Sequence, residues 1–407
     1  MVGAGIFALP AALVVTAGRL SLVVLLVAFM LMSLMALCLV EVSSRYDVTG
    51  GPMHYAKEAF GPTAGFVVGW LMYVSRLAAF GAIAVVMLDY AGGLWPVIAT
   101  PTGRVVAITV FVAALAGFNL RGVKYGALLS NVLTLSKGIP LVVLAIAGLW
   151  LGGFTSGLPG AEPDTGGLSK GLLVAIFACM GFEQAAVVAG EERNPQRDIP
   201  ICTIGGMAII GTLYALLMFA CFATVPDLAH SKHPLADAAA RLFGPGGSTA
   251  MSITAAISCA GGLAVWMIVN PRVLYVLAQQ GDMPRALARV DSVRLTPATA
   301  IITSAILVWI LTVSGTFIYL ATFSVIARML MYASTCIALI VLRRKEGAAP
   351  VTIPGGPAWA TIALLCCLGL VATTTGTAVR DVCVALAAGW AVRWAVRAQQ
   401  RERVTAA

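Results

Sequence analysis

Two short interruptions inside long apolar segments are the places where this chain could bind a small polar solute. The first is Gly3-Ala4-Gly5-Ile6 in segment 1–17, and the second is Met180-Gly181-Phe182-Glu183 in segment 169–189. Where a membrane helix opens, its free amides attract a carboxylate and its freed carbonyls suit an ammonium group. An amino acid carries both groups. The first motif alone is equally consistent with a pair of helix-packing glycines.

Glu183 is the one acid that the sequence places well inside an apolar segment. A carboxylate in hydrocarbon costs about 2.5–3.5 kcal/mol, so we expect it to have a partner or a role. Two interpretations stay open. Glu183 could be a gating or proton-linked carboxylate, or it could accept hydrogen bonds from loosened backbone amides and only stabilise the interruption.

Three cations are embedded in other apolar segments, namely Arg76, Lys137 and Arg328. Arg76 could bind an acidic substrate, pair with Glu183, or reject cationic substrates. Arg328 could donate to carbonyls freed by a broken helix. Lys137 either faces the bundle, where burial favours proton exchange, or extends to the lipid headgroups. Glu41, near the end of segment 21–43, is expected to have a structural role.

The composition is that of a membrane protein. Of 407 residues, 60% are hydrophobic and 11% are charged, whereas soluble domains contain about 25% charged residues. The apolar segments recur without a polar block, which predicts one transmembrane domain over 1–397 and a tail over 398–407. The net charge of +9 then reflects basic residues at one membrane face rather than nucleic-acid binding. Neither the cysteines nor His54, His230 and His233 have metal-site spacing, so we expect no metal and no cofactor.

A membrane-spanning helix needs about 20 apolar residues, and twelve segments approach that length. They are 1–17, 21–43, 63–91, 103–118, 127–152, 169–189, 201–225, 248–278, 298–314, 316–342, 359–378 and 381–397. From Gly3, the first segment rises only about 22 Å, against a hydrocarbon core of about 30 Å. We therefore expect the first helix to be truncated at its N-terminus. Residues 226–241 are expected to form an outer lid.

Charge and segment order predict the topology of this all-α membrane protein. Lysine and arginine concentrate in every second loop and in the tail, which places both termini in the cytoplasm and the chain in the cytoplasmic membrane. Residues 1–152 and 169–342 each contain five segments and begin with an interrupted one. An odd number of segments per half inverts the second half relative to the first. Residues 359–397 add two further helices.

The chain resembles the amino acid–polyamine–organocation permease superfamily. The matching stretches are Gly3–Phe7, Glu41–Arg45, Gly50–Pro52, Tyr55–Ala56, Ala59–Pro62, Gly69–Trp70, Gly181–Glu183, Gly190–Glu191, Asn194–Pro195 and Ile199–Pro200. The resemblance implies the inverted five-helix repeat of the leucine transporter, with two extra helices. It also implies a substrate held between the first, third, sixth, eighth and tenth helices.

The same resemblance implies roles for single residues. Backbone atoms of Ala4, Gly5 and Ile6 would meet the head group of the substrate, and Phe177 would close over it. The implied pocket-lining residues are Cys179, Met180, Gly181, Ser75, Arg76, Thr322 and Ser324, with Gly261, Gly262 and Trp266 as candidates from the eighth helix. Lys137 resembles a lysine of some family members whose amine replaces the cation of sodium-coupled relatives. This implies proton coupling or sodium-independent exchange.

These observations predict a secondary active transporter that moves amino acids by alternating access. Neutral amino acids are the expected substrates, because the positive charge of Arg76 disfavours cationic ones. Small residues such as Ala178 leave room for the side chain of the substrate. The alternatives are an amino-acid sensor on a transporter scaffold, and an exchanger of polyamines or acidic amino acids. An enzyme would need clustered His, Asp or Glu at one face. The expected partners are a small amino acid or amine, protons and the lipid bilayer. The sequence does not indicate an oligomeric state.

Overall fold

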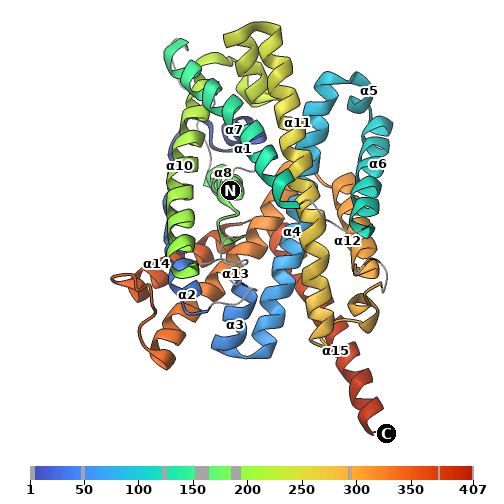
Figure 1. The fold of residues 1–407 in the computed structure, drawn as a ribbon. Coiled ribbons are helices and arrows are strands. Elements are labelled where there is room, and N and C mark those ends of the chain that lie inside the picture. Colours follow the sequence, from blue (N-terminus) through green and yellow to red (C-terminus); the bar gives the residue numbers. More distant parts are fainter. Residues whose placement is uncertain are drawn as a thin grey trace.

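The computed structural model describes the chain except for residues 1–4, 47–50, 122–125, 152–164, 185–193, 292–293, 295, 375 and 406–407. Within the helices, the side chains of 126–136, 165, 195 and 401–405 are also left undescribed. The described residues form helices and connecting loops, with no strand among them (Figure 1). The predicted all-α class is confirmed for this part of the chain.

The helices of the first half follow each other with short connections. They are α1 (Gly5–Ala17), the 3-10 turn η1 (Gly18–Leu20), α2 (Ser21–Ser43), α3 (Pro52–Phe60), α4 (Pro62–Leu94), α5 (Pro96–Ala99), α6 (Pro101–Leu120) and α7 (Gly126–Leu151). Proline occupies the first turn of α3, α4, α5 and α6. A proline there loses no helical hydrogen bond, which explains why the helices begin at these residues.

The second half repeats this pattern of long helices. It contains α8 (Thr165–Cys179), α10 (Pro195–Thr224), η3 (Leu228–His230), α11 (Pro234–Gln279), η4 (Arg285–Ala288), α12 (Ala298–Ser314), α13 (Phe317–Glu346), α14 (Gly356–Thr373) and α15 (Gly376–Thr405). The predicted segments 21–43 and 298–314 coincide with α2 and α12. Segment 248–278 lies within α11. α11 begins before this segment because it joins two helical stretches across a kink at Gly244, where φ is +72°.

Seven stretches of the described residues are long and apolar enough to cross a membrane. One of them, Gly5–Ser43, joins α1 and α2 through η1. Shorter apolar helices cover Lys137–Leu151, Gly166–Cys179 and Ala298–Ser314. The helices therefore suit a bundle that crosses the bilayer several times, while the count of twelve crossings stays a prediction.

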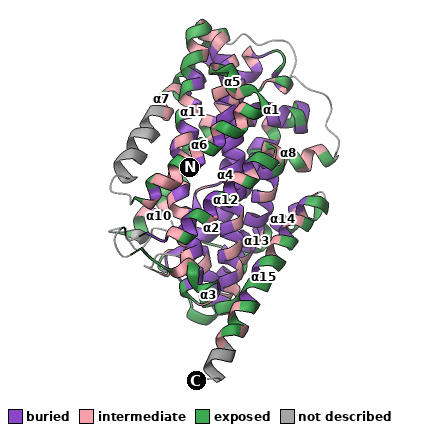
Figure 2. Ribbon diagram, turned by 90° about the vertical axis from the view of Figure 1, so that its right-hand side faces the viewer, coloured by how far each residue is buried: buried purple, intermediate pink, exposed green. Residues whose placement is uncertain are grey.

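α4 is the central helix of the bundle. In its most apolar stretch 94% of the residues are buried, against 22% in α6 and 28% in α14. Figure 2 shows this gradient from the buried centre to the exposed outer helices. α4 packs against α11, α12 and α13, and α8 packs against α1 and α2. A central helix buried on all sides can carry polar groups that lipid-facing helices cannot.

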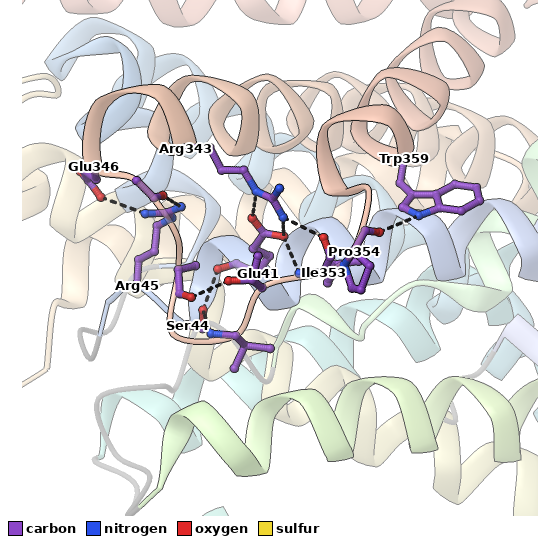
Figure 3. A network of polar contacts seen from close by, with 12 residues as sticks. Glu41, Ser44, Arg45, Arg343, Glu346, Ile353, Pro354 and Trp359 are labelled. Carbon is purple, nitrogen blue, oxygen red and sulfur yellow. Dashed lines mark hydrogen bonds and ion pairs between the residues drawn. The ribbon is translucent and has the colours of Figure 1, made fainter.

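A polar cluster ties α2 to the far end of α13 and to the loop before α14 (Figure 3). The carboxylate of Glu41 is fully buried and accepts from Nε and Nη2 of Arg343 and from the N–H of Ile353 at 3.0 Å. Nη2 of Arg343 also donates to the Ile353 carbonyl at 2.8 Å. These contacts give Glu41 the structural role expected from the sequence.

We expect Glu41→Ala to lower the stability of the protein by about 2 kcal/mol, because it removes a fully buried carboxylate that bonds Arg343 and leaves the Ile353 N–H without its acceptor. The measurement is thermal unfolding in detergent. Glu346→Gln is the matched control, because Glu346 is 45% exposed where it pairs with Arg45, and such pairs contribute less than about 1 kcal/mol. Equal losses for the two variants would contradict the structural role of Glu41.

Candidate functional site

The predicted interruption of the second motif is present in the structure. α8 ends at Cys179, and Met180 makes only a weak turn contact of 3.4 Å to the Phe177 carbonyl. Gly181 has φ of +115°, a region that residues with a Cβ rarely adopt. Helical geometry resumes at Glu183, and the Gln184 N–H donates to the Gly181 carbonyl at 3.2 Å. The backbone is therefore open at residues 180–182.

Glu183 receives hydrogen bonds from three directions at this interruption. Nη1 of Arg328 donates to Oε1 at 2.5 Å, the Tyr332 hydroxyl donates to Oε2 at 2.9 Å, and the Gly181 N–H donates to Oε2 at 3.0 Å. The side chain is 1% exposed. One carboxylate thus satisfies an amide freed by the broken helix and fixes α13 against it.

Arg328 forms an ion pair with Glu183. Structural pairing is the commoner use of an embedded arginine, and donation to freed carbonyls was the other possibility that the sequence left open. Its Nε donates to Ser75 Oγ at 2.9 Å, and Ser75 Oγ donates to the Ser324 carbonyl at 3.0 Å. The guanidinium also lies 6.0 Å from the ring of Trp266. The predicted residues Ser75, Ser324 and Trp266 therefore meet around Arg328.

Arg76 lies beside the same interruption but contacts a different residue. Its Nη2 donates to Oε1 of Gln184 at 3.1 Å, while the ion pair of Glu183 is with Arg328. Arg76 is 2% exposed and within electrostatic range of Arg328, Glu183 and Tyr332. The predicted proximity of Arg76 to Glu183 is therefore present, without a direct hydrogen bond.

The described end of the first motif lies against α8, while Gly3 and Ala4 fall outside the described residues. Gly5 is the first described residue of α1, and a Cβ added to it would stand 3.1 Å from the Ala178 Cα. The small size of both residues permits this approach. Ile6 is fully buried, and the Phe7 carbonyl accepts from the Tyr90 hydroxyl at 2.9 Å. Ala4 lies outside the described residues.

An aromatic contact connects the end of α8 to the wall of a pocket of about 540 Å³. The Phe177 ring packs edge-on against Phe317, with centroids 5.8 Å apart, and Phe317 also lines the cavity. The cavity is bounded by α1, α4, α6, η3 and the start of α13, and part of the predicted outer lid, including Lys232, lines it. Asp89 and Arg104 form an ion pair of 2.5 Å in its wall. Phe177 is therefore in contact with one residue of the pocket wall, and its role as a ring that closes over a ligand stays a prediction.

The remaining predicted site residues lie on α7, on α13 and at the end of α8. Cys179 Sγ donates to the Ala175 carbonyl at 3.1 Å within α8, and Met180 is buried. Thr322 is buried on α13, one turn from the Phe317 end. Lys137 is partly buried on α7, within electrostatic range of Cys259 on α11. The lysine therefore has a neighbour inside the bundle.

Sequence reasoning missed Tyr332, Gln184 and Phe317. Tyr332 follows Arg328 by four residues, so the two share one face of α13. That spacing could have indicated a joint partner. Gln184 directly follows Glu183 and gives no comparable signal. Phe317 lies 140 residues from Phe177, so their contact depends on the fold.

Comparison with known families agrees with this arrangement. The family model described as "Amino acid permease" matches residues 1–388. The chain belongs to this family. The superfamily resemblance is thereby confirmed, and the chain is a multi-pass membrane protein of a transporter family rather than an enzyme.

Curated relatives are amino acid transporters and exchangers. The chain is 27% identical to the human b(0,+)-type amino acid transporter 1 over 87% of its length and 76% of the relative. It is 25% identical to the serine/threonine exchanger SteT of Bacillus subtilis, over 85% of the chain and 80% of the relative. A cadaverine/lysine antiporter of Escherichia coli is 26% identical, over 72% of the chain and 67% of the relative.

Gly181→Ala should destabilise the open backbone by about 1–3 kcal/mol, because the new Cβ disfavours a φ of +115°. The measurement is thermal unfolding together with the affinity for a transported amino acid. Gly369→Ala in α14 is the control, because its Cβ would meet no atom within 4 Å. If Gly181→Ala had no more effect than this control, the special geometry of the interruption would be contradicted.

Proposed function

We propose that this permease moves amino acids across the cytoplasmic membrane by alternating access. One observation carries the proposal. Gly5 at the start of α1 lies against Ala178, next to the point where the backbone of α8 opens. Opened helices supply the charged ends that a zwitterionic head group needs. A cavity behind Phe177 and Phe317 offers an entrance.

The proposed head-group site consists of backbone atoms of Ala4, Gly5 and Ile6 together with residues 178–181. Phe177 and Phe317 form its proposed lid, because Phe177 precedes the opened backbone of α8 and its ring contacts Phe317 in the wall of the pocket. The proposed pocket-lining residues are Ser75, Arg76, Cys179, Met180, Gly181, Thr322 and Ser324. Glu183 holds the α8 interruption open and couples it to α13.

The proposed architecture is a pair of inverted five-helix repeats, 1–152 and 169–342, followed by α14 and α15, with both termini in the cytoplasm. Two observations support it. The first helices of the two halves, α1 and α8, pack together, and the backbone opens directly after α8 at Gly181. Related first helices would meet in this way at the centre of an inverted repeat.

The substrates expected from the sequence are neutral amino acids. The buried guanidinium groups of Arg76 and Arg328 disfavour a cationic substrate. Arg76 and Arg328 outnumber Glu183 at the interruption, so a further positive charge would be repelled. For mode of transport, exchange or proton coupling is proposed. Two of the curated relatives are named as an exchanger and an antiporter.

Reconstitution into proteoliposomes tests the proposed function. Labelled amino acid should enter at a saturable rate, and unlabelled amino acid inside the vesicles should accelerate entry if transport is an exchange. Vesicles without protein give the background. Saturable binding without flux would contradict the permease proposal and support the sensor that the sequence left open.

Lys137→Ala should abolish the pH dependence of uptake, because an amine partly buried against α11 can exchange a proton during the cycle. The measurement is the initial rate of uptake over a range of external pH. Lys170→Ala removes an exposed lysine at the start of α8 and should leave the profile unchanged. A profile that Lys137→Ala does not alter would remove this residue from the coupling mechanism.

A further inference from the structure

Among the residues that the structure describes, the buried cluster at the α8 interruption contains one more positive than negative charge. Arg76, Arg328 and Glu183 are between 1% and 3% exposed. The charged side chains that act most strongly on Glu183 are these two arginines. Arginine stays protonated in proteins, so the excess cannot be removed by titration. An uncompensated buried charge is costly, which makes this imbalance a feature that requires explanation.

The same cluster leaves two hydrogen-bond donors unused. Nη1 of Arg76 and Nη2 of Arg328 are buried and have no hydrogen-bond partner among the described residues. Glu183 has no acceptor site left for them, because its two oxygens already accept four hydrogen bonds, from Arg328 and Gln184 at Oε1 and from Tyr332 and Gly181 at Oε2. Guanidinium groups bind carboxylates in preference to neutral acceptors, often through two hydrogen bonds. A carboxylate is the acceptor that would both bond these donors and cancel the excess positive charge.

The charge of the substrate decides which amino acid balances the cluster. A neutral zwitterion leaves the excess positive charge in place, and a cationic amino acid doubles it. An amino acid with a carboxylate side chain cancels it. Arg76 stands in the right place for such a side chain, because it contacts Gln184 immediately after the opened backbone.

We propose that Arg76 and Arg328 bind the side-chain carboxylate of an acidic amino acid, so that the permease selects dicarboxylic over neutral substrates. This inference rests on the proposed function, since the head group is assigned to the two interruptions. The neutral substrates expected from the sequence fit that head-group site but leave both guanidinium groups incompletely bonded. Specificity then comes from the buried donors, which penalise a substrate that lacks the acceptor.

Glutamate and glutamine form the sharpest test, because they have nearly the same size and differ in side-chain charge. In proteoliposomes, kcat/KM for glutamate should exceed that for glutamine by about 10- to 100-fold, the range expected for hydrogen bonds to a charged group. Arg76→Gln should reduce this ratio at least tenfold, while Arg76→Lys should restore part of it. Arg380→Gln is the control, because it removes an exposed arginine from α15 and should leave the ratio unchanged.

Several results would overturn the inference. Glutamine preferred over glutamate, or the same ratio in wild type and Arg76→Gln, would remove Arg76 from substrate selection. Glutarate tests the source of the carboxylate, because it lacks the amine. If glutarate inhibits as well as glutamate, the site binds dicarboxylates without the proposed head group. Transport of neutral amino acids without inhibition by glutamate would contradict this inference and leave the proposed function intact.

A binding measurement keeps the inference testable if Arg76→Gln does not fold. Glutamate should raise the unfolding temperature of the wild-type protein more than equal concentrations of glutamine or lysine, because a ligand stabilises the state it binds. Equal shifts for glutamate and glutamine would overturn the charge argument. Absence of flux for every amino acid would instead contradict the proposed permease function.

Discussion

A helix that opens inside a membrane must find hydrogen-bond partners for the backbone groups it frees, and Glu183 meets part of that demand here. Its carboxylate accepts from the Gly181 N–H at the opened turn and from Arg328 and Tyr332 on α13. Water is not available in hydrocarbon to replace such contacts. The position of α13 against α8 is therefore a condition for the interruption to exist.

α13 makes polar contacts with other helices at two positions along its length. Near its middle, Arg328 and Tyr332 bind the interruption of α8, and about 22 Å further along, Arg343 binds Glu41 at the end of α2. The first contact surrounds the candidate site, while the second joins α2 to the loop before α14 (Figure 3). α13 thus links the proposed binding region to the end of the bundle that carries α3. A motion of α8 relative to α13 would break the hydrogen bonds of Glu183 to Arg328 and Tyr332.

Much of the fold could be predicted because the apolar segments are long and end at proline, glycine or charge. α2 and α12 agree residue for residue with the prediction. The interruption at Gly181 could also be predicted, because a glycine beside an embedded acid conflicts with a continuous membrane helix. The partner of Glu183 could not. Arg76 and Arg328 are both embedded cations, and only the packing of α4 and α13 decides that Arg328 forms the ion pair. The contact between Phe177 and Phe317 could not be predicted either, because it also depends on how the helices pack.

The account depends on a head group held between α1 and the opened end of α8. A structure of the protein with a transported amino acid bound tests this most directly. We expect its carboxylate and ammonium groups within hydrogen-bond distance of main-chain atoms in residues 4–6 and 178–181, beneath Phe177. A ligand found only in the outer cavity beside Asp89 and Arg104, with both interruptions unoccupied, would contradict the account.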